Sequence, residues 1–118
     1  MYQPSSEDYP EYYKFYIEKV LGTPILEGLE SSAKSIVKHF QDLPSDKHNF
    51  AYEIGKWTPK DMLLHITDTE RVFAYRVLRI LRNDGLDLKG FDQDVFVEAS
   101  QANLLDMKFL IDDFKAVR

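Results

Sequence analysis

The feature that most constrains the fold is a helix start at Thr58, followed by a long run that nothing interrupts. Thr58 precedes Pro59, and Asp61 follows three residues after Thr58. A threonine N-cap, a proline at the first helical position and an acid at the third together favour a helix that begins here. Because neither glycine nor proline occurs between Pro59 and Arg82, we predict one long helix over this stretch.

Placing the helix residues at about 100° steps separates two kinds of surface. Apolar residues form one narrow stripe, which consists of Met62, Ile66, Phe73, Val77 and Ile80. Polar residues gather beside it around Val72, in a wedge made of His65, Asp68, Thr69 and Arg76. Chemistry, if this chain performs any, is expected on that polar wedge.

Composition excludes several classes of protein. The chain has 118 residues, a hydrophobic fraction of 44% and a net charge of −5, which fits one globular domain and argues against nucleic-acid binding through phosphates. It has no cysteine, which excludes disulfides and thiolate sites and fits a reducing compartment. No apolar run approaches the roughly 18 residues that span a bilayer. We expect a soluble cytoplasmic protein that does not bind membranes.

Further helices are predicted on both sides of the central one. Residues 1–10 form an irregular lead-in, residues 11–21 a short helix that ends at Gly22, and residues 24–42 a helix that starts at a Thr-Pro pair. Beyond the Asn-Asp-Gly turn at 83–85, residues 86–102 are expected to form a long loop with one helical turn near 92–97. Asn103 is the predicted N-cap of a last helix over 104–118. Phe15, Phe40, Phe73 and Phe114 are predicted core residues.

His65 is the first candidate for chemistry, and it has two interpretations. An imidazole beside an apolar stripe can be a metal ligand or a general base. It can equally be an inert boundary histidine that is hydrogen-bonded. No second histidine lies on this helix, and His39 and His48 are expected at the surface. Since a metal needs about three protein ligands, spacing alone does not establish a site.

Three charged residues near His65 also carry alternatives. Asp68, one turn on, could orient the imidazole or be a solvated acid. Arg76 could clamp an anionic group of a substrate or pair with surface acids. Glu70 falls in the apolar sector, where a carboxylate is costly unless it is paired, so we favour a buried structural contact, for example with the indole of Trp57.

Several stretches resemble the DinB-like superfamily of helical-bundle proteins. The run over 56–83 looks like that family's tryptophan-containing helix start and its H-x-x-D-x-E-R signature, here Trp57, His65, Asp68, Glu70 and Arg71. Residues 86–100 are similar to the family's loop between its second and third helices, and residues 114–118 to part of its third helix. The resemblance implies an all-α, up-down-down-up four-helix bundle, often dimeric, with residues 1–118 as a single helical domain whose fourth helix is missing.

The family resemblance also implies a metal site. Family members typically hold nickel or zinc with three histidines, one at the position of His65 and two on the fourth helix. This chain ends before the third helix is finished, so only His65 can be carried over. We expect a fragment of a longer protein rather than a member that has lost its metal, because residues 104–118 end without a stop motif.

Two functions follow as hypotheses. The first is a metal-dependent enzyme, a transferase or a hydrolase, with His65 as metal ligand, Asp68 as orienting partner and Arg76 as contact for a substrate carboxylate. As a transferase it would act on a small thiol such as bacillithiol or mycothiol. The second is a non-catalytic helical module that forms homodimers through an apolar helix face. Nucleic-acid binding is disfavoured by the acidic charge.

Overall fold

A computed structural model describes residues 4–85 and 87–118, and all regular structure in these ranges is helical. The predicted all-α class is therefore confirmed for the described residues, whereas the expectations for residues 1–3 and Leu86 lie outside them. The elements are 3₁₀ turns and α-helices in the following order: η1 (Glu11–Tyr13), α1 (Lys14–Glu18), α2 (Ile25–Asp42), η2 (Ser45–Lys47), α3 (Pro59–Leu81), α4 (Gln93–Ser100), η3 (Ala102–Leu104) and α5 (Met107–Val117).

The chain divides into two compact units, residues 1–35 and 36–118, and each is described by itself. In the first unit, the predicted helix over 11–21 is shorter than expected, because η1 and the five-residue α1 occupy only part of it. The aromatic side chains of this stretch are largely exposed. Phe15 is among them, contrary to its predicted core position. Helix α1 ends at Glu18 with Lys19 at its C-cap position, so Gly22 is not the helix end that was predicted. Gly22 lies in the turn that follows and adopts φ +85°, a left-handed conformation that favours glycine.

Helix α2 runs across the division and begins one residue after the predicted start. Its end at Asp42 is confirmed, since Pro44 follows closely and a residue before proline is pushed out of the helical region. Phe40 is buried in the second unit, as predicted.

The predicted central helix is confirmed as α3. The Thr58 side chain accepts a hydrogen bond from the Asp61 backbone N–H, while the Asp61 carboxylate accepts from the Thr58 backbone N–H at 2.9 Å. This reciprocal capping box, with Pro59 at the first helical position, fixes where α3 begins.

The segment after α3 is more helical than the sequence suggests. Where one turn was expected near 92–97, the eight-residue α4 forms, because Asp92 caps it by accepting hydrogen bonds from the backbone N–H groups of Asp94 and Val95. Asn103 is not the N-cap of the last helix. That helix, α5, begins later, with Asp106 at the N-cap position.

Asn103 instead ties η3 to the start of α3. Its side-chain amide donates to both carboxylate oxygens of Asp61, at 3.0 and 3.1 Å, and its side-chain carbonyl accepts from the Thr58 hydroxyl at 2.8 Å. Since Thr58 and Asp61 are buried, these bonds satisfy groups that would otherwise be costly. They place the beginnings of α3 and α5 at the same end of the unit.

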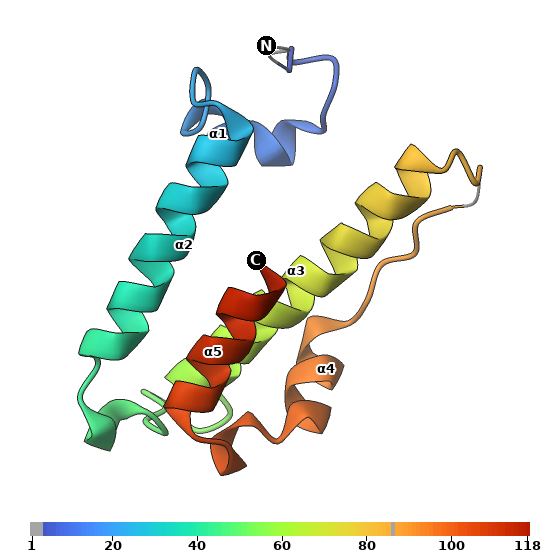
Figure 1. Cartoon of the computed structure of the whole chain (residues 1–118). Helices are drawn as coiled ribbons and strands as arrows, with labels where there is room; N and C mark the ends of the chain where they lie inside the picture. Colours follow the sequence, from blue (N-terminus) through green and yellow to red (C-terminus); the bar gives the residue numbers. More distant parts are fainter. Residues whose placement is uncertain (1–3, 86) are drawn as a thin grey trace. The chain divides into compact units, whose positions relative to one another are not determined.

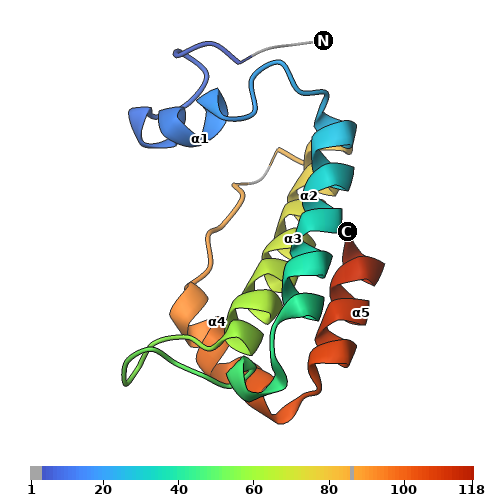
Figure 2. The same ribbon diagram turned by 90° about the vertical axis from the view of Figure 1, so that its left-hand side faces the viewer.

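Helices α3 and α5 therefore run side by side in the same direction, with the chain returning through α4 between them (Figures 1 and 2). The core of this unit consists of fully buried side chains that face each other across the pair, chiefly Leu63, Thr67, Leu110 and Phe114. The burial of Phe114 confirms its predicted core position. A parallel pair is the arrangement expected for the middle helices of an up-down-down-up bundle, and the complete four-helix order stays a prediction.

The apolar stripe of α3 does not face this core. Phe73 is 55% exposed, contrary to its predicted core position, and Val77 and Ile80 are 53% and 66% exposed. The reason is register: Leu63 and Thr67, which α5 covers, lie on a different side of α3. We call Met62, Phe73, Val77 and Ile80 the exposed stripe.

Candidate functional site

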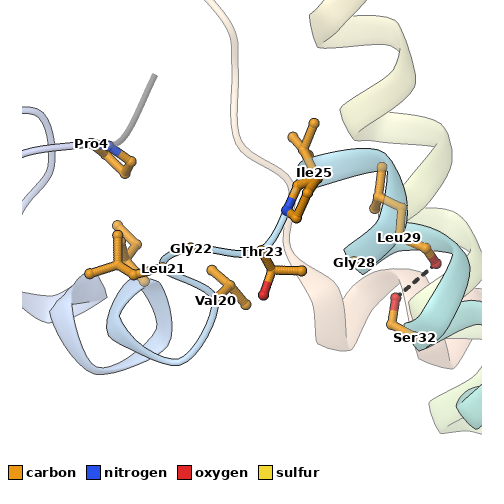
Figure 3. A pocket seen from close by; sticks show the side chains of 11 residues that line it. Pro4, Val20, Leu21, Gly22, Thr23, Ile25, Gly28, Leu29 and Ser32 are labelled. Carbon is orange, nitrogen blue, oxygen red and sulfur yellow. Dashed lines mark hydrogen bonds between the residues drawn. The ribbon is translucent and has the colours of Figure 1, made fainter. Parts of the chain in front are cut away.

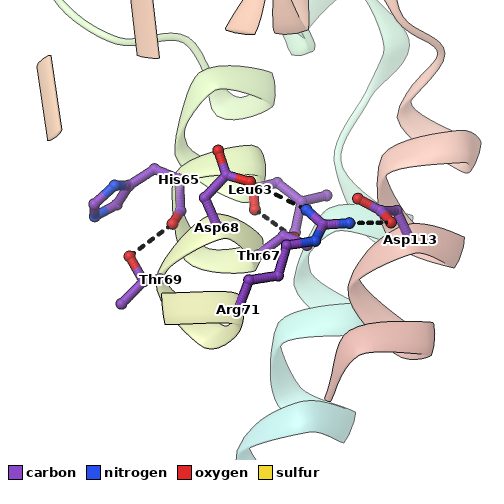
Figure 4. A network of polar contacts seen from close by, with 7 residues as sticks. All are labelled: Leu63, His65, Thr67, Asp68, Thr69, Arg71 and Asp113. Atoms are coloured by element: carbon purple, nitrogen blue, oxygen red, sulfur yellow. Dashed lines mark hydrogen bonds and ion pairs between the residues drawn. The ribbon is translucent and has the colours of Figure 1, made fainter. Parts of the chain in front are cut away.

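The polar signature residues of α3 are held in register by the capping box, and the structure divides them into two groups. Arg71 donates to Asp113 of α5, Glu70 pairs with Arg118 at the end of α5, and Asp68 accepts a hydrogen bond from Arg71. His65 projects to the other side of α3 (Figure 4). The division follows from the helical period, because α5 covers only one side of α3.

His65 lies against Trp57, the residue that precedes the capping box. Their ring centroids are 4.9 Å apart and the ring planes are tilted by 52°. The imidazole is partly exposed, but its Nδ1 atom is buried without a hydrogen-bond partner among the described residues. A buried ring nitrogen without a partner is costly, which distinguishes His65 from an inert, hydrogen-bonded histidine.

No hydrogen bond joins Asp68 to His65 in the described part of the chain. One of its oxygens accepts from Arg71 at 3.1 Å, and a second nitrogen of the same guanidinium donates to Asp113 of α5 at 2.6 Å (Figure 4). The hydrogen bond to Asp113 raises the pKa of the Arg71 guanidinium above its usual value. Asp68, Arg71 and Asp113 thus form a charged bridge, which we call the α3–α5 bridge.

Glu70 is paired, as its place in the apolar sector requires. Its carboxylate lies 3.2 Å from a guanidinium nitrogen of Arg118, and both side chains are largely buried. The predicted structural contact is confirmed, but its partner is Arg118 rather than the Trp57 indole. Glu70 therefore fastens the end of α5 to α3.

The Thr69 side chain is hydrogen-bonded within α3. Its hydroxyl donates to the backbone carbonyl of His65 at 2.8 Å, and Thr67 donates in the same way to Leu63 (Figure 4). Such bonds to the preceding turn satisfy the hydroxyl within the helix, so neither threonine is free to bind a ligand as placed here.

Arg76 lies three turns beyond His65 on the same face of α3, about 16 Å away along the axis at 1.5 Å per residue. It lines a pocket of about 520 Å³ together with residues from α3 and from the loop after it, namely Val72, Tyr75, Arg79, Asp87, Leu88 and Lys89. Arg76 donates to the Lys89 backbone carbonyl at 2.7 Å and pairs with no acid that the structure describes. The expected pairing with surface acids is therefore not found there.

The other two histidines lie elsewhere. His39 packs edge-on against Phe40, and the Nε2 atom of His48 lies 3.1 Å from the Leu43 carbonyl. Within residues 4–85 and 87–118, no three histidine, aspartate or glutamate side chains are grouped so as to hold a metal ion. Among the histidines that the structure describes, His65 is the one with a buried ring nitrogen that has no hydrogen-bond partner.

Three residues of the second unit were missed by sequence reasoning: Asp113, Arg118 and Lys89. Asp113 and Arg118 each lie on the side of α5 that faces α3, where the period of the apolar residues of α5 could have placed them. Lys89 enters through its loop backbone, for which no periodic pattern exists.

A second pocket, of about 580 Å³, lies within the first unit (Figure 3). Its lining is apolar, with Ile17, Val20 and Leu21 on one side and Leu29 on the first turns of α2. Its lining includes the hydroxyls of Thr23 and Ser32 and no acidic or basic side chain.

Comparison with known proteins identifies the family. The profile of the DinB superfamily matches residues 29–118, which is most of the chain. No curated protein and no solved structure matches. In the described ranges, none of the helices has the length and apolar character needed to cross a membrane. The match spans α3, its signature residues and α5, so the chain belongs to the DinB superfamily.

Proposed function

We propose that His65 is one ligand of a divalent metal, nickel or zinc, in a metal-dependent transferase that acts on a low-molecular-weight thiol such as bacillithiol or mycothiol. The observation that carries the proposal is the division of the signature residues. Arg71 and Glu70 are engaged in contacts with α5 and its end, Asp68 is engaged with Arg71, and His65 has a buried ring nitrogen without a hydrogen-bond partner among the described residues.

The residues in hand do not complete a metal site. A catalytic metal needs about three protein ligands, and the described residues bring no such group together. The proposal therefore assigns the remaining ligands to protein outside the described residues. When bound, such a metal would lower the pKa of a coordinated thiol and so supply a thiolate at neutral pH.

Neighbouring residues of the chain would hold the His65 imidazole in place. Trp57 covers one face of the imidazole and restricts its rotation. Asp68 accepts a hydrogen bond from Arg71. In this proposal it therefore affects the position of His65 through the backbone of α3 and not by a direct hydrogen bond to the imidazole. Arg76 would contact an anionic group of the substrate at the far end of the same face.

Trp57 provides the test, because it is the only tryptophan of the chain and lies against His65. Paramagnetic Ni²⁺ bound at the imidazole should quench Trp57 fluorescence, and addition of a small thiol should then produce thiolate-to-nickel absorption. We expect both effects to be lost in His65→Gln and kept in His39→Gln, which removes an exposed histidine elsewhere. Quenching that survives unchanged in His65→Gln would refute the proposal.

A second candidate function, a non-catalytic homodimeric module, is favoured by the exposed stripe of α3. Met62, Phe73, Val77 and Ile80 present apolar surface that the described residues leave 48–66% exposed, and such surface commonly marks an interface. In this case, sedimentation should give a dimer that Val77→Glu dissociates, and neither protein should bind metal or thiol. A monomer at micromolar concentration would remove this alternative.

A further inference from the structure

The pocket beside the second half of α3 is unusual in a chain with a net charge of −5. Three cationic residues line it, Arg76 and Arg79 from α3 and Lys89 from the following loop. Val72 and Leu88 add apolar surface, and Tyr75 adds an aromatic ring. A concave site of this size with a few polar groups and apolar walls is typical of small-molecule binding.

The positive charge of the pocket is only partly neutralised. Arg79 is bidentate to Asp84, with nitrogen–oxygen distances of 2.5 and 2.8 Å. Neither Arg76 nor Lys89 forms an ion pair with any residue that the structure describes. Counting the carboxylates of Asp84 and Asp87 against the three cations leaves one uncompensated positive charge at the pocket.

Arg76 also has an unused donor. Its Nε atom is buried and has no hydrogen-bond partner among the described residues, while another nitrogen of the same guanidinium donates to the Lys89 carbonyl. A buried donor without a partner costs roughly 1–3 kcal/mol. A ligand acceptor that draws the guanidinium toward it would remove this penalty.

From these observations we infer that the pocket binds the carboxylate of a small, partly apolar ligand. The carboxylate pairs with the Arg76 guanidinium, and Lys89 adds a second charge-assisted contact. The remainder of the ligand lies on Val72 and Leu88. A single uncompensated charge matches a singly charged carboxylate better than a doubly charged phosphate.

The inference rests on the proposed function only where the ligand is taken to be a substrate or product of the enzyme. The binding site itself is argued from the contacts of Arg76 and does not require a metal. His65 lies about 16 Å away along α3, at 1.5 Å per residue. One carboxylate cannot touch both, so the anion site and the metal ligand are separable by experiment.

The test uses benzoate as the probe and the Nε–H resonance of Arg76 in nitrogen-15 NMR of the full chain as the readout. We expect benzoate to shift this resonance saturably, whereas benzyl alcohol, its uncharged counterpart, produces no shift and inorganic phosphate binds more weakly. Arg76→Gln should weaken benzoate binding at least tenfold, followed through the backbone amides of Leu88 and Lys89, because a hydrogen bond to a charged group contributes about 1.5–3 kcal/mol.

Matched variants make the result specific. Arg82→Gln removes the same charge from the next turn of the chain without touching the pocket lining, and benzoate binding should stay within about twofold. Lys89→Gln, on the loop, should weaken binding severalfold even if Arg76→Gln perturbs folding. His65→Gln should leave benzoate binding unchanged, so that failure of the metal proposal is seen separately.

Three results would show that the pocket is not an anion site centred on Arg76. They are an Arg76 resonance that benzoate does not shift, an equal response to benzyl alcohol, and an Arg82→Gln variant that loses as much affinity as Arg76→Gln. Tighter binding of phosphate than of benzoate would contradict the assignment to a carboxylate.

Discussion

The α3–α5 bridge predicts a specific loss of stability when its centre is removed. In Arg71→Met, the methionine side chain fills much of the same volume but leaves Asp68 and Asp113 without their shared cation. The two carboxylates then face each other across neighbouring helices, so the change removes two attractive contacts and adds a repulsion.

The magnitude follows from exposure. The Arg71 side chain is 45% exposed, and the two aspartates are 26% and 24% exposed. Solvent therefore screens much of the interaction, and each contact is worth about 0.2–1 kcal/mol. Adding the repulsion between two half-buried carboxylates, we expect a total loss of about 1–2 kcal/mol in the free energy of unfolding.

Urea unfolding measured by circular dichroism provides the assay. The loss should shrink in 1 M NaCl, where the screening length falls to about 3 Å, and Asp113→Asn should recover part of it in the Arg71→Met background. Arg82→Met, which removes a cation outside the bridge, is the control and should change stability by less than about 0.5 kcal/mol. A loss of equal size in the control, or one unaffected by salt, would refute the account of the bridge.

Three further predictions concern the packing and charge of the second unit. Leu63→Ala, at a fully buried position, should lower the free energy of unfolding by about 2–5 kcal/mol in urea titration; a loss below about 1 kcal/mol would contradict the core assigned to α3 and α5. Asn103→Ala leaves buried Asp61 without the amide that donates to it, so we expect a loss of about 1–3 kcal/mol, whereas an unchanged midpoint would show that η3 does not anchor α3. The hydrogen bond from Lys108 lowers the pKa of Asp112, so Lys108→Gln should raise the pH at which Asp112 titrates in NMR. A carboxyl group whose pKa is lower in the folded than in the unfolded protein stabilises the fold at pH values above the unfolded pKa, and this effect is lost as the pH falls through the folded pKa. The difference in stability between the two proteins should therefore vanish in acid. A difference that grows in acid would contradict this prediction.

The start of α3 could be predicted closely because its determinants are local. Thr58, Pro59 and Asp61 lie within four residues. Thr58 and Asp61 accept hydrogen bonds from each other's backbone N–H groups, and Pro59 occupies the first helical position. The same local reasoning failed for Asn103. It has the residue type of an N-cap, but its side chain is hydrogen-bonded to Thr58 and Asp61, about 45 positions earlier in the chain. Partners this far apart in the chain cannot be predicted from the spacing of residues within one helix.

The candidate site was predictable in part. The helical period placed His65, Asp68 and Arg76 on one wedge, but it could not show that Asp68 would pair with Arg71 while Arg71 also donates to Asp113. That choice depends on where α5 packs. For Glu70, the cost of an unpaired carboxylate among apolar residues indicated a partner, although only the fold identified it as Arg118.

Zinc titration followed by nitrogen-15 NMR of the histidine rings tests the central claim most directly. The account predicts that Zn²⁺ shifts the ring nitrogens of His65 first and saturably, while those of His39 and His48 keep their positions over the same range. Equal shifts at all three histidines, or a His65 ring that does not respond to the metal, would contradict it.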